Sequence, residues 1–189
     1  MMSIITNSYS NVASTFFGTK FQKNIEELLV SPLKPQTIVL GYISGGIFRG
    51  ICIGFLVSII ATFFSSIQIH NITLIILTAI LTSTFFSLCG MINGIFAKKF
   101  DDIAIIPTFI LTPLTYLGGV FYPMSILPEF WQNISYLNPM IYLINIFRFG
   151  FIGVSDIPIL NSFIFLLIIT LTFWQICILC LKKGIGIKE

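Results

Sequence analysis

Charged residues are scarce in this sequence of 189 residues. Asp, Glu, Lys and Arg together make up 9% of the chain, whereas they account for about a quarter of an average soluble domain. They are absent from four long runs, which are 51–69, 72–97, 103–128 and 157–181. A chain with so few charges cannot cover a surface that faces water, and this scarcity excludes a soluble globular protein.

The groups that carry catalysis, metal binding or ATP binding are also missing or isolated. There is one histidine, His70, and each of the four cysteines lies in an apolar run, where a thiol behaves as a small apolar side chain. No G-x-x-x-x-G-K-[ST] loop is present to hold the phosphates of ATP. The long runs contain no chain of His, Asp and Glu that could relay protons. We therefore predict a protein that is not an enzyme and that needs no cofactor or metal.

What remains is apolar sequence in lengths that fit a membrane. The mean hydropathy is +1.00, and about 20 helical residues are enough to cross a bilayer core. Because backbone groups in lipid must pair within their own segment, these runs are predicted to be helices. The prediction is an all-α fold, a polytopic transmembrane helical bundle, in one domain over 1–189. Its spans are expected at approximately 38–67, 72–97, 103–122 and 158–181, preceded by a polar partial membrane helix at 1–19.

The lysines predict which ends of these spans face the cytoplasm. They occur in three clusters, before the first long run, between the second and third runs, and after the fourth. Since basic residues favour the cytoplasmic side, both the N-terminal region and the C-terminus are predicted to be cytoplasmic, and nucleic acid is not an expected partner. The clustered residues are Lys20, Lys23 and Lys34, then Lys98 and Lys99, then Lys182, Lys183 and Lys188.

A short charged segment, NIEELLVSPL, stands out before the first long run. Asn24 is placed to cap a helix, with Glu27 three residues later, and Ser31-Pro32 should end that helix. The predicted helix over 24–31 is amphipathic and too short to be stable alone. It must therefore dock on a partner, or else lie on the lipid surface.

Glycines recur every four residues in two of the predicted spans, and this spacing lets helices approach closely. The alternative is glycine scattered as membrane helices tolerate it. Arg49 interrupts the first glycine face, and we expect it either to reach the cytoplasmic interface or to point into the bundle. The predicted packing glycines are Gly41, Gly45, Gly46, Gly50, Gly54, Gly90 and Gly94.

The third run contains Pro107 and Pro113, which should bend it. The region that follows, 123–156, is apolar but broken by prolines, and we predict short outer helices that dip back into the membrane. Its charged residues, Glu129, Arg148 and Asp156, are expected to be single and separated. They give no support to acid–base catalysis.

Together these motifs resemble the type-2 ABC exporter permeases over essentially the whole chain. NIEELLVSPL followed by the glycine-rich span resembles that family's cytoplasmic coupling region. PLTYLGGVFYP with the later N-P and R-x-G is similar to its C-terminal outer signature. The coupling residues implied by this likeness are Glu26, Glu27, Leu28, Leu29, Ser31 and Pro32. The outer signature or gate residues implied by it are Gly118, Gly119, Tyr122, Pro123, Asn138, Pro139 and Arg148.

The resemblance implies a permease that moves an unidentified substrate with ATP hydrolysed by a separate ATP-binding subunit. The implied assembly is two permeases with two ATPases in lipid, in a bacterial inner membrane. Permeases of this family usually have six spans, whereas this sequence starts within what resembles the second. We keep as an alternative a membrane interaction protein without transport, or an eroded permease remnant. A largely apolar pathway would favour hydrophobic or amphipathic cargo.

Overall fold

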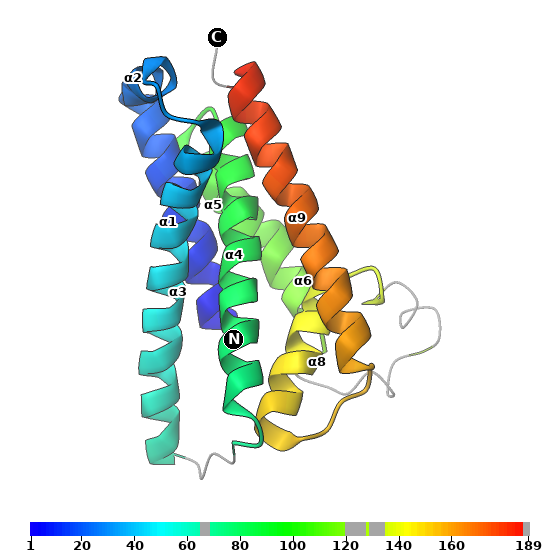
Figure 1. Cartoon of the computed structure of the whole chain (residues 1–189). Coiled ribbons are helices and arrows are strands. Elements are labelled where there is room, and N and C mark those ends of the chain that lie inside the picture. The colour runs from blue at the N-terminus through cyan, green and yellow to red at the C-terminus, as the bar shows by residue number, and fades with distance from the viewer. Residues whose placement is uncertain (65–68, 120–127, 129–134, 187–189) are drawn as a thin grey trace.

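The computed structural model describes residues 1–64, 69–119, 128 and 135–186, without the side chain of Leu29. All regular structure in this part of the chain is helical, and the predicted all-α fold class is confirmed (Figure 1). Four of the described helical segments are long and apolar enough to cross a membrane. They are Pro35–Phe64 (α3), Ile72–Phe96 (α4), Phe100–Leu117 and Ile159–Lys183 (α9).

The third of these segments is one bent helix in three parts. These are α5 (Phe100–Ile106), a π-helix η1 (Pro107–Leu111) and α6 (Thr112–Leu117). It ends before the expected limit at residue 122, because Gly119 turns the backbone with a φ of 76°. The remaining helices with described bounds are α1 (Met2–Phe21), α2 (Asn24–Val30) and α8 (Pro139–Ile152).

Pro107 explains both the bend and a distant hydrogen bond. Proline has no N–H, so the carbonyl of Ile103 loses its helical partner. The buried side chain of Asn93 in α4 donates to this carbonyl at 3.4 Å. At the other end of η1, the Thr112 hydroxyl donates to the Pro107 carbonyl at 3.0 Å, and the Thr112 N–H pairs with the same oxygen. The bent helix is thereby fixed to α4.

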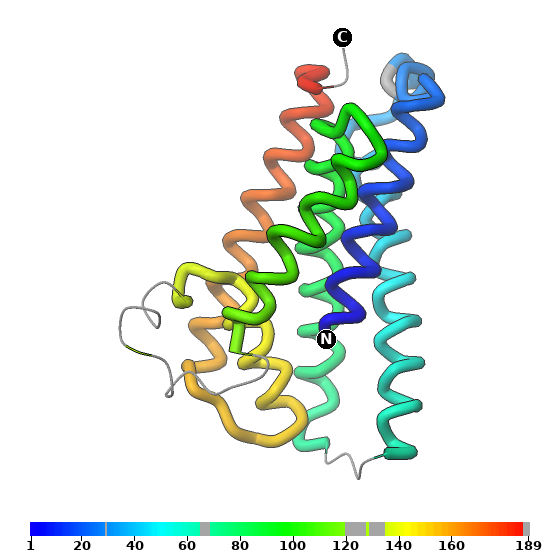
Figure 2. Tube along the Cα trace, turned by 180° about the vertical axis from the view of Figure 1, so that it is seen from behind, coloured from blue at the N-terminus to red at the C-terminus, as the bar shows by residue number. Residues whose placement is uncertain are grey.

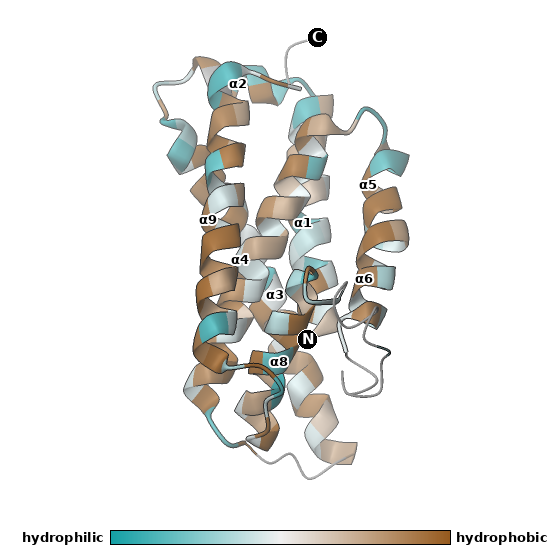
Figure 3. Ribbon diagram, turned by 90° about the vertical axis from the view of Figure 1, so that its right-hand side faces the viewer, coloured by the Kyte–Doolittle hydropathy of each residue, from teal (hydrophilic) through white to brown (hydrophobic). Residues whose placement is uncertain are grey.

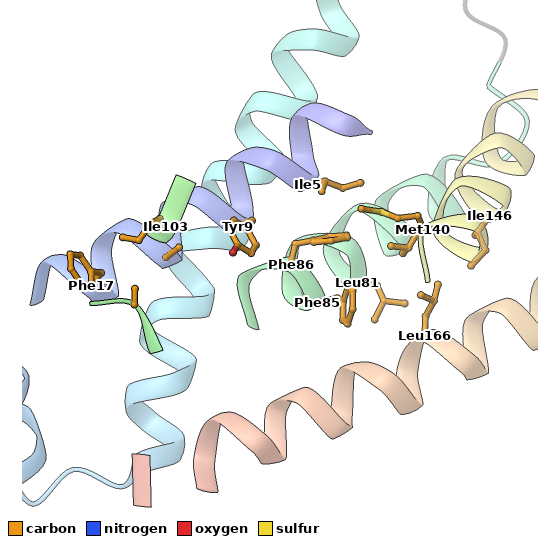
Figure 4. Packing of buried hydrophobic residues seen from close by; sticks show 13 residues of the cluster. Ile5, Tyr9, Phe17, Leu81, Phe85, Phe86, Ile103, Met140, Ile146 and Leu166 are labelled. Atoms are coloured by element: carbon orange, nitrogen blue, oxygen red, sulfur yellow. The ribbon is translucent and has the colours of Figure 1, made fainter. Parts of the chain in front are cut away.

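The helix pair α1 and α4 forms the centre of the bundle. A Cβ built at Gly90 would collide with the carbonyl oxygen of Tyr9, and one at Gly94 would lie 3.1 Å from that of Ala13. Tyr9 and Ala13 are almost fully buried beside Phe86, and the cluster continues to Met140 of α8 and Leu166 of α9 (Figure 4). Glycine therefore sets the distance between these two helices.

Glycines of α3 pack against the same pair. A Cβ at Gly46 would collide with the Ser87 hydroxyl, and one at Gly50 with the Ser8 hydroxyl. Gly54 faces Ile4 in the same way. The other two predicted packing glycines of α3 are exposed: Gly45 has Asn11 at 3.8 Å, and Gly41 has no neighbour within 4 Å.

The start of α2 differs from the prediction. Asn24 is not its N-cap; it is the first helical residue, and its side chain donates to Gln22. The N-cap is Lys23, whose φ of 62° turns the chain sharply from the end of α1. This left-handed residue replaces the expected capping box, because the two helices are joined too closely for an extended cap.

The predicted cytoplasmic segments lie at one end of the bundle. Figure 1 shows α2, the turn between α4 and α5, and the C-terminus at the top. The end of α3 and the connection between α8 and α9 lie at the bottom. The three lysine clusters are thus gathered at the same end, as far as their residues are described.

Replacing Gly90 with Ala tests the central contact. The added methyl group meets backbone, which cannot rotate away, so we expect a loss of about 1–3 kcal/mol and a lower unfolding temperature in neutral detergent. The matched control is Gly41→Ala, where the methyl group meets open space and should cost nothing. Equal melting temperatures for the two variants would contradict this account of the α1–α4 contact.

Candidate functional site

The candidate coupling helix α2 is anchored to the bundle by one side. Ile25 is 2% exposed and packs in a cluster with Val12 and Phe16 of α1, and Leu28 lies half-buried against the same cluster. The opposite side exposes Glu26 and Glu27. This short helix therefore has a fixed inner face and a free acidic outer face.

The end of α2 adds apolar groups to the outer face. Val30 is 88% exposed, and Leu33 and Pro32 are also exposed. The Ser31 hydroxyl donates to the Leu28 carbonyl at 2.6 Å and closes the last turn. Two carboxylates therefore lie beside exposed apolar side chains on the outer face of α2. Leu29 was also predicted here, but its side chain is outside the described structure.

Lys20 connects the α1–α2 junction to the turn between α4 and α5. Its Nζ donates to the carbonyls of Ile95 at 2.8 Å and Ala97 at 3.0 Å, which are left without helical partners at the end of α4. In the same turn, Asp102 accepts from the N–H groups of Lys98 and Lys99. Sequence reasoning missed this link, because residues 75 and 77 positions apart give no local signal.

At the opposite end, the residues of the outer signature converge where α6 meets α8. Asn138 caps α8 by accepting from the Met140 N–H at 2.9 Å, and donates to the Leu114 carbonyl of α6 at 2.7 Å. Pro139 occupies the first position of α8, where its missing N–H costs nothing. Gly118 is buried against Met140. Tyr122 and Pro123 lie outside the described residues.

Arg148 forms an ion pair with Asp156 across the corner between α8 and α9. The expectation that these charges are separated is therefore wrong, since the chain reverses direction between them. Asn145, one turn before Arg148, is 3% exposed and spans the same corner. Its side chain accepts from the N–H of Asp156 at 2.8 Å and donates to the carbonyl of Ile157 at the same distance. Asn145 was not predicted as part of this corner, because its hydrogen-bond partners lie 11 and 12 residues later in the sequence, beyond the reversal of the chain.

A cavity of about 220 Å³ lies between the start of α1 and the π-helix. Its lining mixes four threonine hydroxyls with apolar groups, and no ionisable side chain contributes to it. The residues around it are Met2, Ile5, Thr6, Pro107, Thr108, Leu111, Thr112 and Thr115. Elsewhere in the described chain, no three His, Cys, Asp or Glu residues gather into a possible metal site.

Comparisons with known proteins identify the family of this chain and several relatives. The model of a family described as ABC-2 type transporter matches residues 1–152. The inner membrane transport permease YadH of Escherichia coli K12 is 52% identical over 189 residues, which is 100% of this chain and 74% of the relative. Nodulation protein J of Sinorhizobium fredii is 24% identical over 145 residues, covering 77% of this chain and 55% of that protein. No solved structure matches the chain.

Two substitutions at the α8–α9 corner compare how much the Asn145 hydrogen bonds and the Arg148–Asp156 ion pair each contribute to the free energy of unfolding. Asn145→Ala leaves the Asp156 N–H and the Ile157 carbonyl, whose hydrogen bonds to Asn145 are partly buried, without these partners, and should cost about 1–3 kcal/mol. Arg148→Gln breaks an ion pair whose side chains are 25% and 37% exposed, so water screens it and about 0.2–1 kcal/mol is expected. Thermal unfolding in detergent measures both, with exposed Asn161→Ala as control. A larger loss in Arg148→Gln would contradict the assigned role of Asn145.

Proposed function

The chain belongs to the ABC-2 type transporter family, and from this we propose a route by which ATP hydrolysis on another subunit moves its membrane helices. It is a permease subunit of an ABC transporter and a multi-pass protein of the inner membrane. Family membership implies an ATP-binding subunit as its partner.

The outer face of α2 is the proposed contact with the ATP-binding subunit. One observation carries this assignment: α2 exposes Glu26, Glu27 and Val30, while buried Ile25 fixes the helix to α1. A helix of seven residues is not stable alone. Movement imposed on its outer face is therefore passed to α1. Leu28 is half-buried and contributes more to the anchor than to the contact.

Lys20 offers the next step of this route. A shift of α1 pulls on two charge-assisted hydrogen bonds to the end of α4, close to the start of the bent helix. The bent helix leads to Gly118 and Gly119, beside the corner held by Asn145 and Arg148. The proposed outcome is export, in which closure of the ATPases opens the outer end.

The working assembly in this proposal has two copies of the chain and two ATP-binding subunits. The copies lie in the membrane with the α2 end in the cytoplasm, which is supported by the lysines at that end. Phe55, Phe63 and Leu171 are exposed on α3 and α9 and fit contact with lipid chains.

Charge reversal on α2 tests the contact. Glu26→Lys combined with Glu27→Lys should lower the ATPase activity of the permease–ATPase complex by about tenfold, equivalent to about 1.4 kcal/mol of coupling energy. The membrane helices should remain folded, because both side chains point outward. Activity is measured in nanodiscs with the co-purified ATP-binding subunit.

The control is Asp101→Lys, which reverses one acidic charge on an exposed residue at the same end, in the first turn of α5. It should leave the ATPase activity unchanged. If the double variant copurifies and hydrolyses ATP like wild type, α2 is not the coupling surface.

A reporter fused after Glu189 tests the orientation. With the C-terminus in the cytoplasm, a fused green fluorescent protein should fluoresce in cells, and a fused alkaline phosphatase should be inactive. The physical reason is that Lys182 and Lys183 end α9 and favour the cytoplasmic side. Active alkaline phosphatase with dark fluorescent protein would invert the proposed topology.

A further inference from the structure

Arg49 lies near the middle of the membrane-spanning helix α3. The helix has 30 residues and begins at Pro35, which places Arg49 about 21 Å from its start at ~1.5 Å per residue. The neighbouring Gly50 packs beside Ser83, itself near the middle of α4. The Arg49 side chain is exposed, so it neither enters the bundle of this chain nor lies at a helix end. Among the described residues, no ion pair involves it.

Arg49 borders α1 on the outside of the bundle. Gly45, one helical turn before it, is exposed and has Asn11 of α1 as its neighbour. The helices run in opposite directions, as Figure 2 shows, and one turn further along α3 Gly50 meets Ser8. Arg49 therefore lies along the same edge, at the level of α1 between Asn7 and Asn11.

The outward side of α1 is polar, although it lies at membrane depth. Its inner residues are mainly apolar and buried, whereas its outward residues carry hydroxyls or amides. Figure 3 shows α1 paler than the strongly apolar α9. We call this side the polar face; it consists of Ser3, Thr6, Asn7, Ser10, Asn11, Ser14 and Thr15, all exposed or half-exposed.

Contact of Arg49 and the polar face with lipid chains would cost free energy. An arginine at the centre of a bilayer costs about 2.5–3.5 kcal/mol or more, and the polar face adds amides that lipid cannot satisfy. Some hydroxyls are internally paired, as Thr6 is to the Met2 carbonyl and Thr15 to that of Asn11. The Asn11 side chain has no recorded partner in the described structure. The surface therefore faces water or a polar partner.

A second copy of the chain cannot supply the missing negative charge. None of its seven acidic residues falls within the charge-free runs, and each lies near an end of a predicted span. Within the given sequence, no acidic residue is therefore expected at the depth of Arg49, and an anionic ligand would supply that charge. The acidic residues are Glu26, Glu27, Asp101, Asp102, Glu129, Asp156 and Glu189.

We propose that Arg49 and the polar face bind the head group of an anionic, hydroxyl-bearing amphiphile as cargo of the permease. The guanidinium pairs with a phosphate or similar anion, and the asparagine and serine side chains bond to hydroxyls. Thr6 belongs both to this face and to the 220 Å³ cavity, whose Met2, Ile5 and Leu111 suit an apolar chain. This inference rests on the proposed permease function and narrows the expected amphipathic cargo to negatively charged molecules.

Binding of two lysolipids to the purified chain tests the site. Lysophosphatidylglycerol carries a negative charge and free hydroxyls, whereas lysophosphatidylcholine has the same chain without net charge. In neutral detergent, the first should raise the unfolding temperature of the wild type in a saturable way and the second should not. Arg49→Gln should weaken this apparent affinity by about tenfold, and Arg49→Lys should retain part of it.

Two control variants distinguish binding at Arg49 and the polar face from non-specific attraction of the anionic lipid to positive charge. Lys34→Gln removes a positive charge just before α3, outside the polar face, and should bind like wild type. Asn11→Leu keeps Arg49 and should weaken lysophosphatidylglycerol binding by removing an amide. Because no ATP-binding subunit is needed, this assay can fail while α2 coupling holds, and the reverse.

Two results would overturn the proposal. One is equal binding of lysophosphatidylglycerol by wild type and Arg49→Gln, which would mark the lipid as an adventitious additive only. The other is a change from dimer to monomer in Arg49→Gln with lipid binding unchanged, which would assign the polar face to contact between copies.

Discussion

The close approach of α1 to α4 at Gly90 and Gly94 is the constraint on which the rest of the bundle depends. It places the end of α1 beside the end of α4, where Lys20 reaches the carbonyls of Ile95 and Ala97. It also leaves α1 with only one side free, and the polar residues occupy that side. The position of α2 and that of the polar face therefore both depend on a single backbone contact.

A hydrogen bond joins α3 to this pair, from the Tyr42 hydroxyl to Thr19 of α1 at 3.0 Å, but close packing alone holds the helices together at three buried serines. Ser8, Ser83 and Ser87 are fully buried, and their hydroxyls have no hydrogen-bond partner in the described structure. The glycines opposite them, Gly46 and Gly50, allow close van der Waals contact. Since no directional bond is made between these side chains, little is broken if the helices shift along each other. Such a contact suits a protein whose helices must move.

The fold class could be predicted from the length and composition of the apolar runs. Contacts between residues that turns of the chain bring together could not. The charge-free runs gave the all-α membrane fold, because bilayer thickness sets the length of a helix. Asn24 was given the wrong role, since Lys23 adopts a left-handed turn that composition does not reveal. The pairing of Arg148 with Asp156 depends on the corner after α8, and the Lys20 contacts on the packing of α1 against α4. The coupling and outer residues came from motifs, and their roles stay predictions.

The π-helix η1 gives the bent helix a torsional property. Its turn closes from the Pro107 carbonyl to the N–H of Thr112, one residue more than an α-helical turn. Each residue of an α-helix rotates the chain by about 100°. If this turn returned to α-helical pairing, α6 would therefore rotate about the helix axis by roughly that angle relative to α5. Gly118 would turn away from Met140 and Ile144, and a side chain would face α8 in its place. The one extra residue in this turn thus permits a coupled rotation and translation of α6 relative to α5.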